Sequence, residues 1–235
     1  MASEPHENLR SDFPGATSAE CDNGWVEVEY SNESRSVSAR CPRCELEKIR
    51  DAAAAFTPPR FRRPIAVPPP VTAWAARGTD AQGLYLAGQV GTGKTHAAWI
   101  AVAAWCLTTG TVPHGDANDA RHSGVGPTVI FARMTDLLDS FRPGDDSVRR
   151  VRDCQHAGLL VIDDLGAEKP SEWTQERLYS VIDHRYANCL PLIVTSNLPP
   201  KQVAEQAGER VASRLAEMCE VVLMTGADRR KRGVA

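Results

Sequence analysis

Short apolar runs alternate with longer helical patterns between about residue 71 and residue 227. The runs have the apolar content of buried strands, and the segments between them have the length and spacing of helices. The predicted strands are Gly83–Ala87, Thr128–Ala132, Gly158–Asp163, Leu192–Ser196 and Glu220–Met224, and the predicted helices cover 93–108, 135–141, 146–156, 172–188 and 200–217. Strands that alternate with helices predict an α/β fold in which helices cover both faces of a parallel sheet.

The N-terminal part of the chain follows a different pattern. Alternating residues at 25–30 and 37–40 predict a hairpin, and 45–56 predicts a helix after it. The polar residues before them are typical of a mobile tail, whereas six prolines within residues 57–70 predict a stiff extended linker. The chain is therefore divided into a tail (1–20), a small cysteine-containing module (21–56), a linker (57–70) and the α/β domain (71–235).

Composition and charge are ordinary for a globular protein, with 42% hydrophobic and 24% charged residues among 235. The net charge of −3 argues against a surface coated in basic residues for nucleic acid, although a local basic patch stays open. No apolar run approaches the roughly 20 residues of a membrane span, and residues 1–10 lack the pattern of a secretory signal. We therefore expect a cytoplasmic protein without a membrane partner.

A glycine-rich loop between the first predicted strand and its helix carries the strongest chemical signal. It matches G-x-x-x-x-G-K-[ST] and consists of Gly88, Gln89, Val90, Gly91, Thr92, Gly93, Lys94 and Thr95. The N–H groups of Gly91, Gly93 and Lys94 would surround the β-phosphate of ATP at a helix N-terminus, with the Lys94 side chain on the β- and γ-phosphates and the Thr95 hydroxyl on Mg²⁺. An ordinary glycine turn before a core helix is the structural alternative.

Polar side chains follow two other predicted strands. The run from Leu159 ends in Asp163 and Asp164, where the carboxyl edge of a parallel sheet binds ligands. Asp163 would hold Mg²⁺ opposite Thr95, and Asp164 would polarise the attacking water as general base. Asn197, after the strand 192–196, would orient that water. The alternatives are a strand-capping turn for the acids and a turn before a proline for Asn197.

Two groups of arginines lie further along the chain. Arg210 and Arg214 are four residues apart and share one helical face, where arginines near a phosphate site stabilise the charge of phosphoryl transfer. A solvated helical face would give the same pattern. The cluster at 229–232 is the second group, and alone it is typical of a solvated tail.

The order and spacing of these motifs resemble the DnaC/DnaI helicase-loader branch of the AAA+ ATPases, with the IstB transposition ATPases as relatives. The resemblance covers about residues 50–232 and rests on GQVGTGKT, LLVIDDLG, VTSN, GERVASRL and ADRR. It implies a P-loop NTPase three-layer sandwich with a five-stranded parallel sheet. It also implies that Gly88–Thr95 is Walker A, Asp163 and Asp164 are Walker B, and Asn197 is the first sensor.

The resemblance further assigns the arginines. Arg214 resembles the arginine finger, which acts on ATP in a neighbouring subunit and implies self-association into a spiral or ring. Arg230 resembles the second sensor, with Arg229 and Arg232 as competing positions. Many AAA+ proteins have Glu where this chain has Asp164. The Asp at this position favours slow, switch-like hydrolysis.

The N-terminus resembles the small zinc-binding domain of helicase loaders. Cys41 and Cys44 match one Cys-x-x-Cys pair, and Cys21 matches the end of the other, with Ser18 where the fourth cysteine would stand. Structural zinc is nearly always four-coordinate. His6 or another group would complete the site, or the module is a metal-free hairpin; both remain open.

In the loader family the N-terminal domain binds the hexameric replicative helicase and the ATPase core contacts single-stranded DNA. Here Arg60–Arg63 and Arg149–Arg152 would line a DNA track, although surface charge explains them equally. The resemblance therefore implies an ATP-dependent loader of a replicative helicase. The alternatives are an IstB-like ATPase that assists a transposase, a non-hydrolysing binding module, and a small-molecule kinase, for which the loop 110–127 offers only Arg121 as a catalytic arginine.

Overall fold

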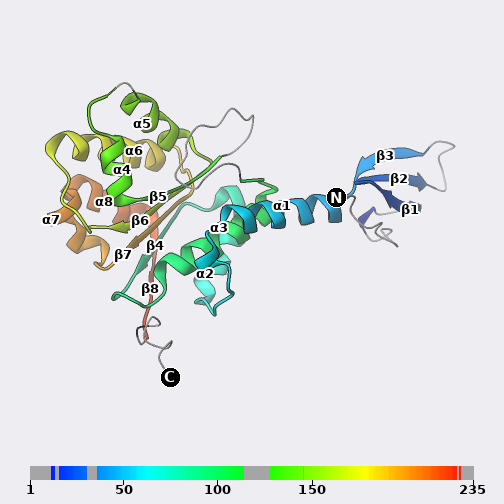
Figure 1. Cartoon of the computed structure of the whole chain (residues 1–235), viewed down its shortest axis with the longest axis horizontal. Helices are drawn as coiled ribbons and strands as arrows, with labels where there is room; N and C mark the ends of the chain where they lie inside the picture. The colour runs from blue at the N-terminus through cyan, green and yellow to red at the C-terminus, as the bar shows by residue number, and fades with distance from the viewer. Residues whose placement is uncertain are drawn as a thin grey trace. The chain divides into compact units, whose positions relative to one another are not determined.

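The computed structural model describes residues 12–13, 16–30, 36–113, 128–144, 146–226 and 228. The chain divides into two compact units, Met1–Ala52 and Ala53–Ala235, drawn in Figure 1. Helix α1 (Pro42–Phe56) crosses the division. No helix among the described residues is both long and apolar enough to span a membrane.

Unit 1 is built on a three-stranded antiparallel sheet. Its strands follow one another in the order β1 (Ala16–Asp22), β2 (Trp25–Tyr30) and β3 (Val37–Arg40). Asn23 and Gly24 join β1 to β2 with φ of 48° and 84°, as a tight hairpin turn requires. β1 begins inside the segment expected to be a tail, because its buried positions are small residues, Ala19 and Cys21, which give a weak apolar pattern.

Unit 2 contains a five-stranded sheet in the order β5-β6-β7-β4-β8. All its neighbouring strands are parallel. The strands are β4 (Gly83–Ala87), β5 (Val129–Arg133), β6 (Leu159–Leu165), β7 (Leu192–Ser196) and β8 (Cys219–Leu223). The predicted α/β fold and its five parallel strands are therefore confirmed. β4 and β7 are buried along their whole length, as central strands covered on both faces must be.

Helices cover both faces of this sheet. They are α2 (Pro69–Ala76), α3 (Lys94–Thr109), α4 (Met134–Ser140), α5 (Ser147–His156), α6 (Glu172–Ala187), α7 (Ala204–Ala207) and α8 (Glu209–Met218), with 3-10 turns η2 (Pro59–Phe61), η3 (Gly78–Asp80) and η4 (Pro200–Val203). Figure 1 shows α2 and α3 on one side and α4 to α8 on the other. Right-handed crossovers require this arrangement. The connection from β4 to β5 crosses the sheet in one direction, and the later connections cross it in the other, so their helices cover opposite faces.

The predicted helix 200–217 is wrong as a continuous element. It is divided into η4, α7 and α8, and the break lies at Gly208. Gly208 has φ of 94°, and a Cβ at this position would lie 2.0 Å from Gln175 Nε2. A left-handed backbone and a close approach both require glycine here, so the chain turns before α8 begins.

The segment 57–70, expected to be an extended linker, lies partly against α3. The Phe61 ring lies 6.3 Å from the Trp99 ring and 5.7 Å from the His96 ring, centroid to centroid. His96 Nε2 is 2.6 Å from the Arg63 carbonyl oxygen. Aromatic contacts and this hydrogen bond attach the proline-rich segment to the helix that follows the glycine-rich loop.

Candidate functional site

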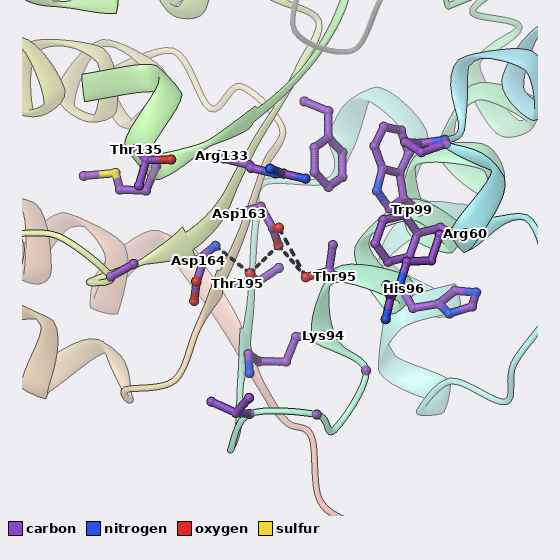
Figure 2. A pocket seen from close by; sticks show the side chains of 18 of the residues that line it. Arg60, Lys94, Thr95, His96, Trp99, Arg133, Thr135, Asp163, Asp164 and Thr195 are labelled. Atoms are coloured by element: carbon purple, nitrogen blue, oxygen red, sulfur yellow. Dashed lines mark hydrogen bonds between the residues drawn. The ribbon is translucent and has the colours of Figure 1, made fainter. Parts of the chain in front are cut away.

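A cavity of about 1040 Å³ opens at the carboxyl edge of the sheet in unit 2. Its lining brings together residues that are far apart in the sequence, as Figure 2 shows. They include Val90, Gly91, Gly93, Lys94 and Thr95 of the loop, Asp163, Asp164, Thr195 and Asn197 of neighbouring strands, and Pro58–Arg62, Trp99, Phe131 and Arg133. Strand order explains the convergence, because β4, β7 and β6 are neighbours and all end at this edge.

The glycine-rich loop has the backbone geometry that anion binding needs. Gly91 and Gly93 have φ of 84° and 94°, and α3 begins at Lys94 directly after them. A Cβ on Gly88 would lie 2.3 Å from the Met224 carbonyl oxygen, so this glycine allows the loop to pass the end of β8. Main-chain N–H groups at a helix N-terminus favour a phosphate.

Lys94 is buried at 8% exposure, although it carries a charge. Its Nζ donates to the carbonyl oxygens of Gly88 and Gln89, at 2.8 and 3.0 Å, and to Asn197 Oδ1 at 2.8 Å. These three acceptors offset the cost of burying an ammonium group. They also hold it between the loop and the end of β7.

Asp163 and Thr95 meet across the cavity floor. The Thr95 hydroxyl donates to Asp163 Oδ1 and lies 2.9 Å from it, and the Thr195 hydroxyl donates to the same oxygen at 2.7 Å. Burial raises the pKa of Asp163, and the two hydroxyl donors act in the opposite direction. A buried carboxylate beside a threonine hydroxyl is a donor set that suits Mg²⁺.

Asp164 and Asn197 lie on the solvent side of that pair. Asp164 has φ of 64°, a strained conformation for a residue with a side chain. Its N–H donates to Thr195 Oγ1 at 2.9 Å, which fixes the turn. Asn197 Nδ2 lies 3.4 Å from Asp164 Oδ1, a long contact. Asn197 therefore contacts both Lys94 and Asp164, which come from opposite sides of the cavity.

An aromatic cluster forms the wall beyond Thr95. Trp99 of α3 stacks on Phe131 of β5 with 3.8 Å between ring centroids and 3° between planes. Phe56 and Phe61 contact Trp99 from the other sides. This wall could not be predicted from the sequence, because its members come from segments that are distant in the chain. Two exposed cations also line the cavity. Arg60 belongs to the stretch that the sequence assigned to a DNA track, whereas Arg133 belongs to no motif.

Arg214 and Arg210 do not line this cavity. Arg214 Nε donates to Asp183 Oδ1 at 2.9 Å, and its guanidinium lies 4.3 Å from the Tyr186 ring. Arg210 lies 3.6 Å above the Tyr179 ring. A finger that acts on a neighbouring subunit is expected outside its own site. All three predicted second-sensor positions lie outside the described residues: Arg229, Arg230 and Arg232. The same holds for His6 and Arg121.

The cysteines of unit 1 form a separate cluster. The sulfur atoms of Cys21, Cys41 and Cys44 all lie within 4.8 Å of one another, and Cys21 Sγ is 3.6 Å from Cys44 Sγ. The described residues contain no other group of three or more potential metal ligands. The side chain of Ser18 lies outside the part of the chain that the structure describes.

The profile of the IstB-like ATP binding proteins matches residues 77–234 of this chain. The phage-like element PBSX protein XkdC of Bacillus subtilis (strain 168) is 30% identical over 152 residues, which cover 60% of this chain and 50% of XkdC. The replicative helicase loader DnaC of Escherichia coli (strain K12) is 26% identical over 95 residues, 38% of this chain and 39% of DnaC. The chain thus spans half or less of the length of these relatives.

Among solved structures, the crystal structure of DnaI superposes with a TM-score of 0.56 and 19% identity. The match covers 76% of this chain and 99% of the other. At this identity the likeness shows a shared fold. It agrees with the five parallel strands and the glycine-rich loop that the sequence predicted.

Proposed function

This chain belongs to the family of IstB-like ATP binding proteins, which are P-loop ATPases, and on that premise we propose that it loads a hexameric replicative helicase onto single-stranded DNA. The observation that carries the ATPase part is the convergence of Lys94, Thr95, Asp163, Asp164 and Asn197 on one cavity. The likeness to the helicase loader DnaC supports the choice of client. A cytoplasmic location agrees with such a role.

The proposed ATP site begins with the phosphates on the loop. The N–H groups around Gly91 and Gly93 would bind the β-phosphate, and Lys94 would bind the β- and γ-phosphates. Asp228, in the closing motif, lies against the loop, since a Cβ on Gly91 would be 2.0 Å from its Oδ1. Asp228 is two residues before Arg230 in the sequence, and its place beside the loop supports Arg230 as second sensor.

Thr95 and Asp163 would hold Mg²⁺, because their oxygens already converge on the cavity floor. Held there, Mg²⁺ would supply positive charge that offsets the negative charge of the phosphates. Asp163 must be ionised to serve as a ligand. Since burial raises its pKa, we expect Mg²⁺ binding to weaken as the pH falls.

Asp164 would accept a proton from the attacking water, and Asn197 would orient that water. The hydrogen bond to Thr195 fixes the backbone of Asp164, while Asn197 lies between the proposed base and Lys94. Asp is one methylene shorter than Glu, so its carboxylate stops further from the γ-phosphate. Slow hydrolysis follows, which suits a protein that holds one state while ATP is bound.

The site is completed in another copy of the chain. Arg214 is held on the face formed by α6 and α8 by Asp183 and Tyr186, outside its own cavity. We assign it as the arginine finger for ATP in a neighbouring subunit. Such a head-to-tail contact repeats into a ring or spiral, in which ATP sits at each junction.

Unit 1 would bind zinc through Cys21, Cys41 and Cys44. In a tetrahedral zinc–thiolate site, bonds of about 2.3 Å place neighbouring sulfurs about 3.8 Å apart. The separation of 3.6 Å between Cys21 and Cys44 fits this spacing. The fourth ligand stays unassigned. Zinc would hold this small unit in the fold that we propose binds the helicase.

The nearest alternative to helicase loading is an IstB-like ATPase that assists a transposase. The two proposals differ in the protein that the chain binds. The test is a pull-down from the native host with the tagged full chain and ATP. Lys94→Ala removes the phosphate-binding cation, and Lys201→Ala, an exposed lysine in η4, is the matched control. We expect wild type and Lys201→Ala to recover the replicative helicase when ATP is present. Lys94→Ala should not show this ATP-dependent recovery. Recovery of a transposase instead would contradict helicase loading.

A further inference from the structure

Arg133 is the last residue of β5, next to the acidic strand β6. In the parallel register it is paired directly with Asp163. Its exposed side chain lines the cavity, and Figure 2 shows it above Asp163, on the far side from Lys94. The cavity thus has a cation on the loop side and another on the opposite wall, with the proposed Mg²⁺ ligands between them.

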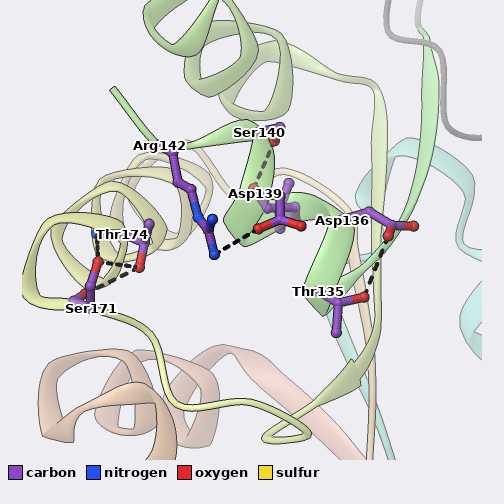
Figure 3. Close-up of polar contacts among 8 residues, drawn as sticks. Thr135, Asp136, Asp139, Ser140, Arg142, Ser171 and Thr174 are labelled. Atoms are coloured by element: carbon purple, nitrogen blue, oxygen red, sulfur yellow. Dashed lines mark hydrogen bonds and ion pairs between the residues drawn. The ribbon is translucent and has the colours of Figure 1, made fainter. Parts of the chain in front are cut away.

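The Arg133 guanidinium makes no hydrogen bond or ion pair with any residue in the described parts of the chain. Two arginines elsewhere in unit 2 are ion-paired. Arg142 pairs with Asp139 at 3.0 Å, as Figure 3 shows, and Arg214 pairs with Asp183. Arg133 is near enough to Asp163 for its charge to lower the pKa of that carboxyl, while Asp163 Oδ1 accepts hydrogen bonds from Thr95 and Thr195. Because Arg133 lines the cavity, its N–H donors are available to a ligand bound there.

The chemistry of ATP hydrolysis explains why a cation is useful on this wall. Lys94 serves the loop side of the phosphates, whereas charge on the γ-phosphoryl group must be stabilised from several directions during transfer. A guanidinium offers paired N–H donors that match phosphate oxygens. β5 is stacked through Phe131 on Trp99, so the strand that carries Arg133 is firmly held.

We propose that Arg133 contacts the γ-phosphate of ATP bound in the same subunit and so distinguishes ATP from ADP. This assignment rests on the proposed ATP site and adds a residue to it. Arg133 acts within one subunit, whereas Arg214 acts between subunits. A chain in isolation would therefore already sense whether the γ-phosphate is present.

The test compares binding of two nucleotides by calorimetry on the full chain with Mg²⁺. The variants are Arg133→Gln, Arg133→Lys and the control Arg142→Gln, which removes an ion-paired surface arginine. For Arg133→Gln we expect affinity for the non-hydrolysable analogue AMPPCP to fall by about tenfold to a hundredfold, the size of a charge-assisted hydrogen-bond loss. ADP affinity should stay within about twofold of wild type by the same scale, and Arg133→Lys should recover part of the loss.

Two outcomes would overturn the assignment. An equal fall in AMPPCP and ADP affinity would mean that Arg133 supports the site as a whole. Unchanged affinity for both nucleotides would mean that Arg133 does not contact the γ-phosphate. Retained ADP binding also reports that the variant is folded. If wild type binds neither nucleotide, the proposed ATP site fails as well, so the two failures are distinguishable.

Discussion

The two units of the chain place their chemical groups differently relative to their cores. In unit 1 the buried cluster consists of Ala19, Cys21, Val26, Val28 and Cys41, so the candidate metal ligands are part of the core. In unit 2 the core is a full layer of apolar strand and helix residues, and the polar groups sit at its edge. A fold with a large core can carry a site without depending on it. The stability of a small unit depends on the groups that cross-link it, such as metal ligands.

Loss of a cysteine should damage unit 1 more than any other change damages the protein. Cys41→Ser removes a fully buried sulfur and leaves two thiols, too few for a structural zinc site. Since metal binding and folding are coupled in such units, we expect zinc to be lost and β1 to β3 to unfold, while ATP hydrolysis by unit 2 continues. Zinc content, measured by atomic emission, and hydrogen exchange of each unit provide the check.

Cys189→Ser is the matched control, because Cys189 is exposed and lies in unit 2. It should retain zinc. The comparison of the units would be wrong if wild type binds no zinc and Cys41→Ser unfolds neither unit. It would also be wrong if Cys41→Ser abolishes ATP hydrolysis.

A smaller but still severe effect is expected from Trp99→Ala in unit 2. Trp99 is 3% exposed and packs against Phe131, Phe56 and Phe61. Removing a buried aromatic side chain costs about 3–5 kcal/mol, so the urea midpoint of unit 2 should fall. Trp173→Ala, at an exposed tryptophan, should cost much less. Equal losses in the two variants would contradict the role given to this wall.

The smallest effect is expected from a change at Thr195, which contacts Asp163 and Asp164 in the proposed ATP site. Thr195→Val removes a donor to Asp163 and the acceptor of the Asp164 N–H. Loss of a buried hydrogen-bond partner costs about 1–3 kcal/mol. Because the Thr195 hydroxyl lowers the pKa of Asp163, its removal should raise that pKa and move the acid limb of Mg²⁺-dependent hydrolysis to higher pH.

A pH profile of hydrolysis measures this shift. Thr108→Val is the control, since Thr108 is exposed and its hydroxyl donates to the Ala104 carbonyl oxygen of its own helix. A limb that moves to lower pH in Thr195→Val, or one that moves equally in both variants, would count against the proposed role of Asp163.

The sheet of unit 2 was predictable because each buried strand is a short apolar run bounded by polar residues. Gly83–Ala87 and Leu192–Ser196 have the predicted bounds, and the other three strands shift by one or two residues. The loop and the acids were predictable for a related reason. Phosphate and Mg²⁺ chemistry needs particular residues at fixed spacing, directly after those runs.

What the sequence did not predict depends on contacts between distant segments. The proline-rich segment carries Phe61, but only the folded chain places it on Trp99. Arg133 has no motif, and its relevance comes from the register that pairs it with Asp163. The helix 200–217 is interrupted because Gly208 must adopt a positive φ beside Gln175, a tertiary constraint that local helix propensity does not contain.

In the proposed assembly, ATP is bound by the loop and acids of one copy and hydrolysed with Arg214 of the next. The most direct measurement is the ATPase rate of Lys94→Ala and Arg214→Ala, alone and mixed. Each variant alone should lose activity, and Arg214→Ala by about a thousandfold or more, as for other arginine fingers. The mixture should regain activity, because Lys94→Ala subunits supply Arg214 to intact loops. A mixture as inactive as its components, or wild-type turnover in Arg214→Ala, would contradict the claim.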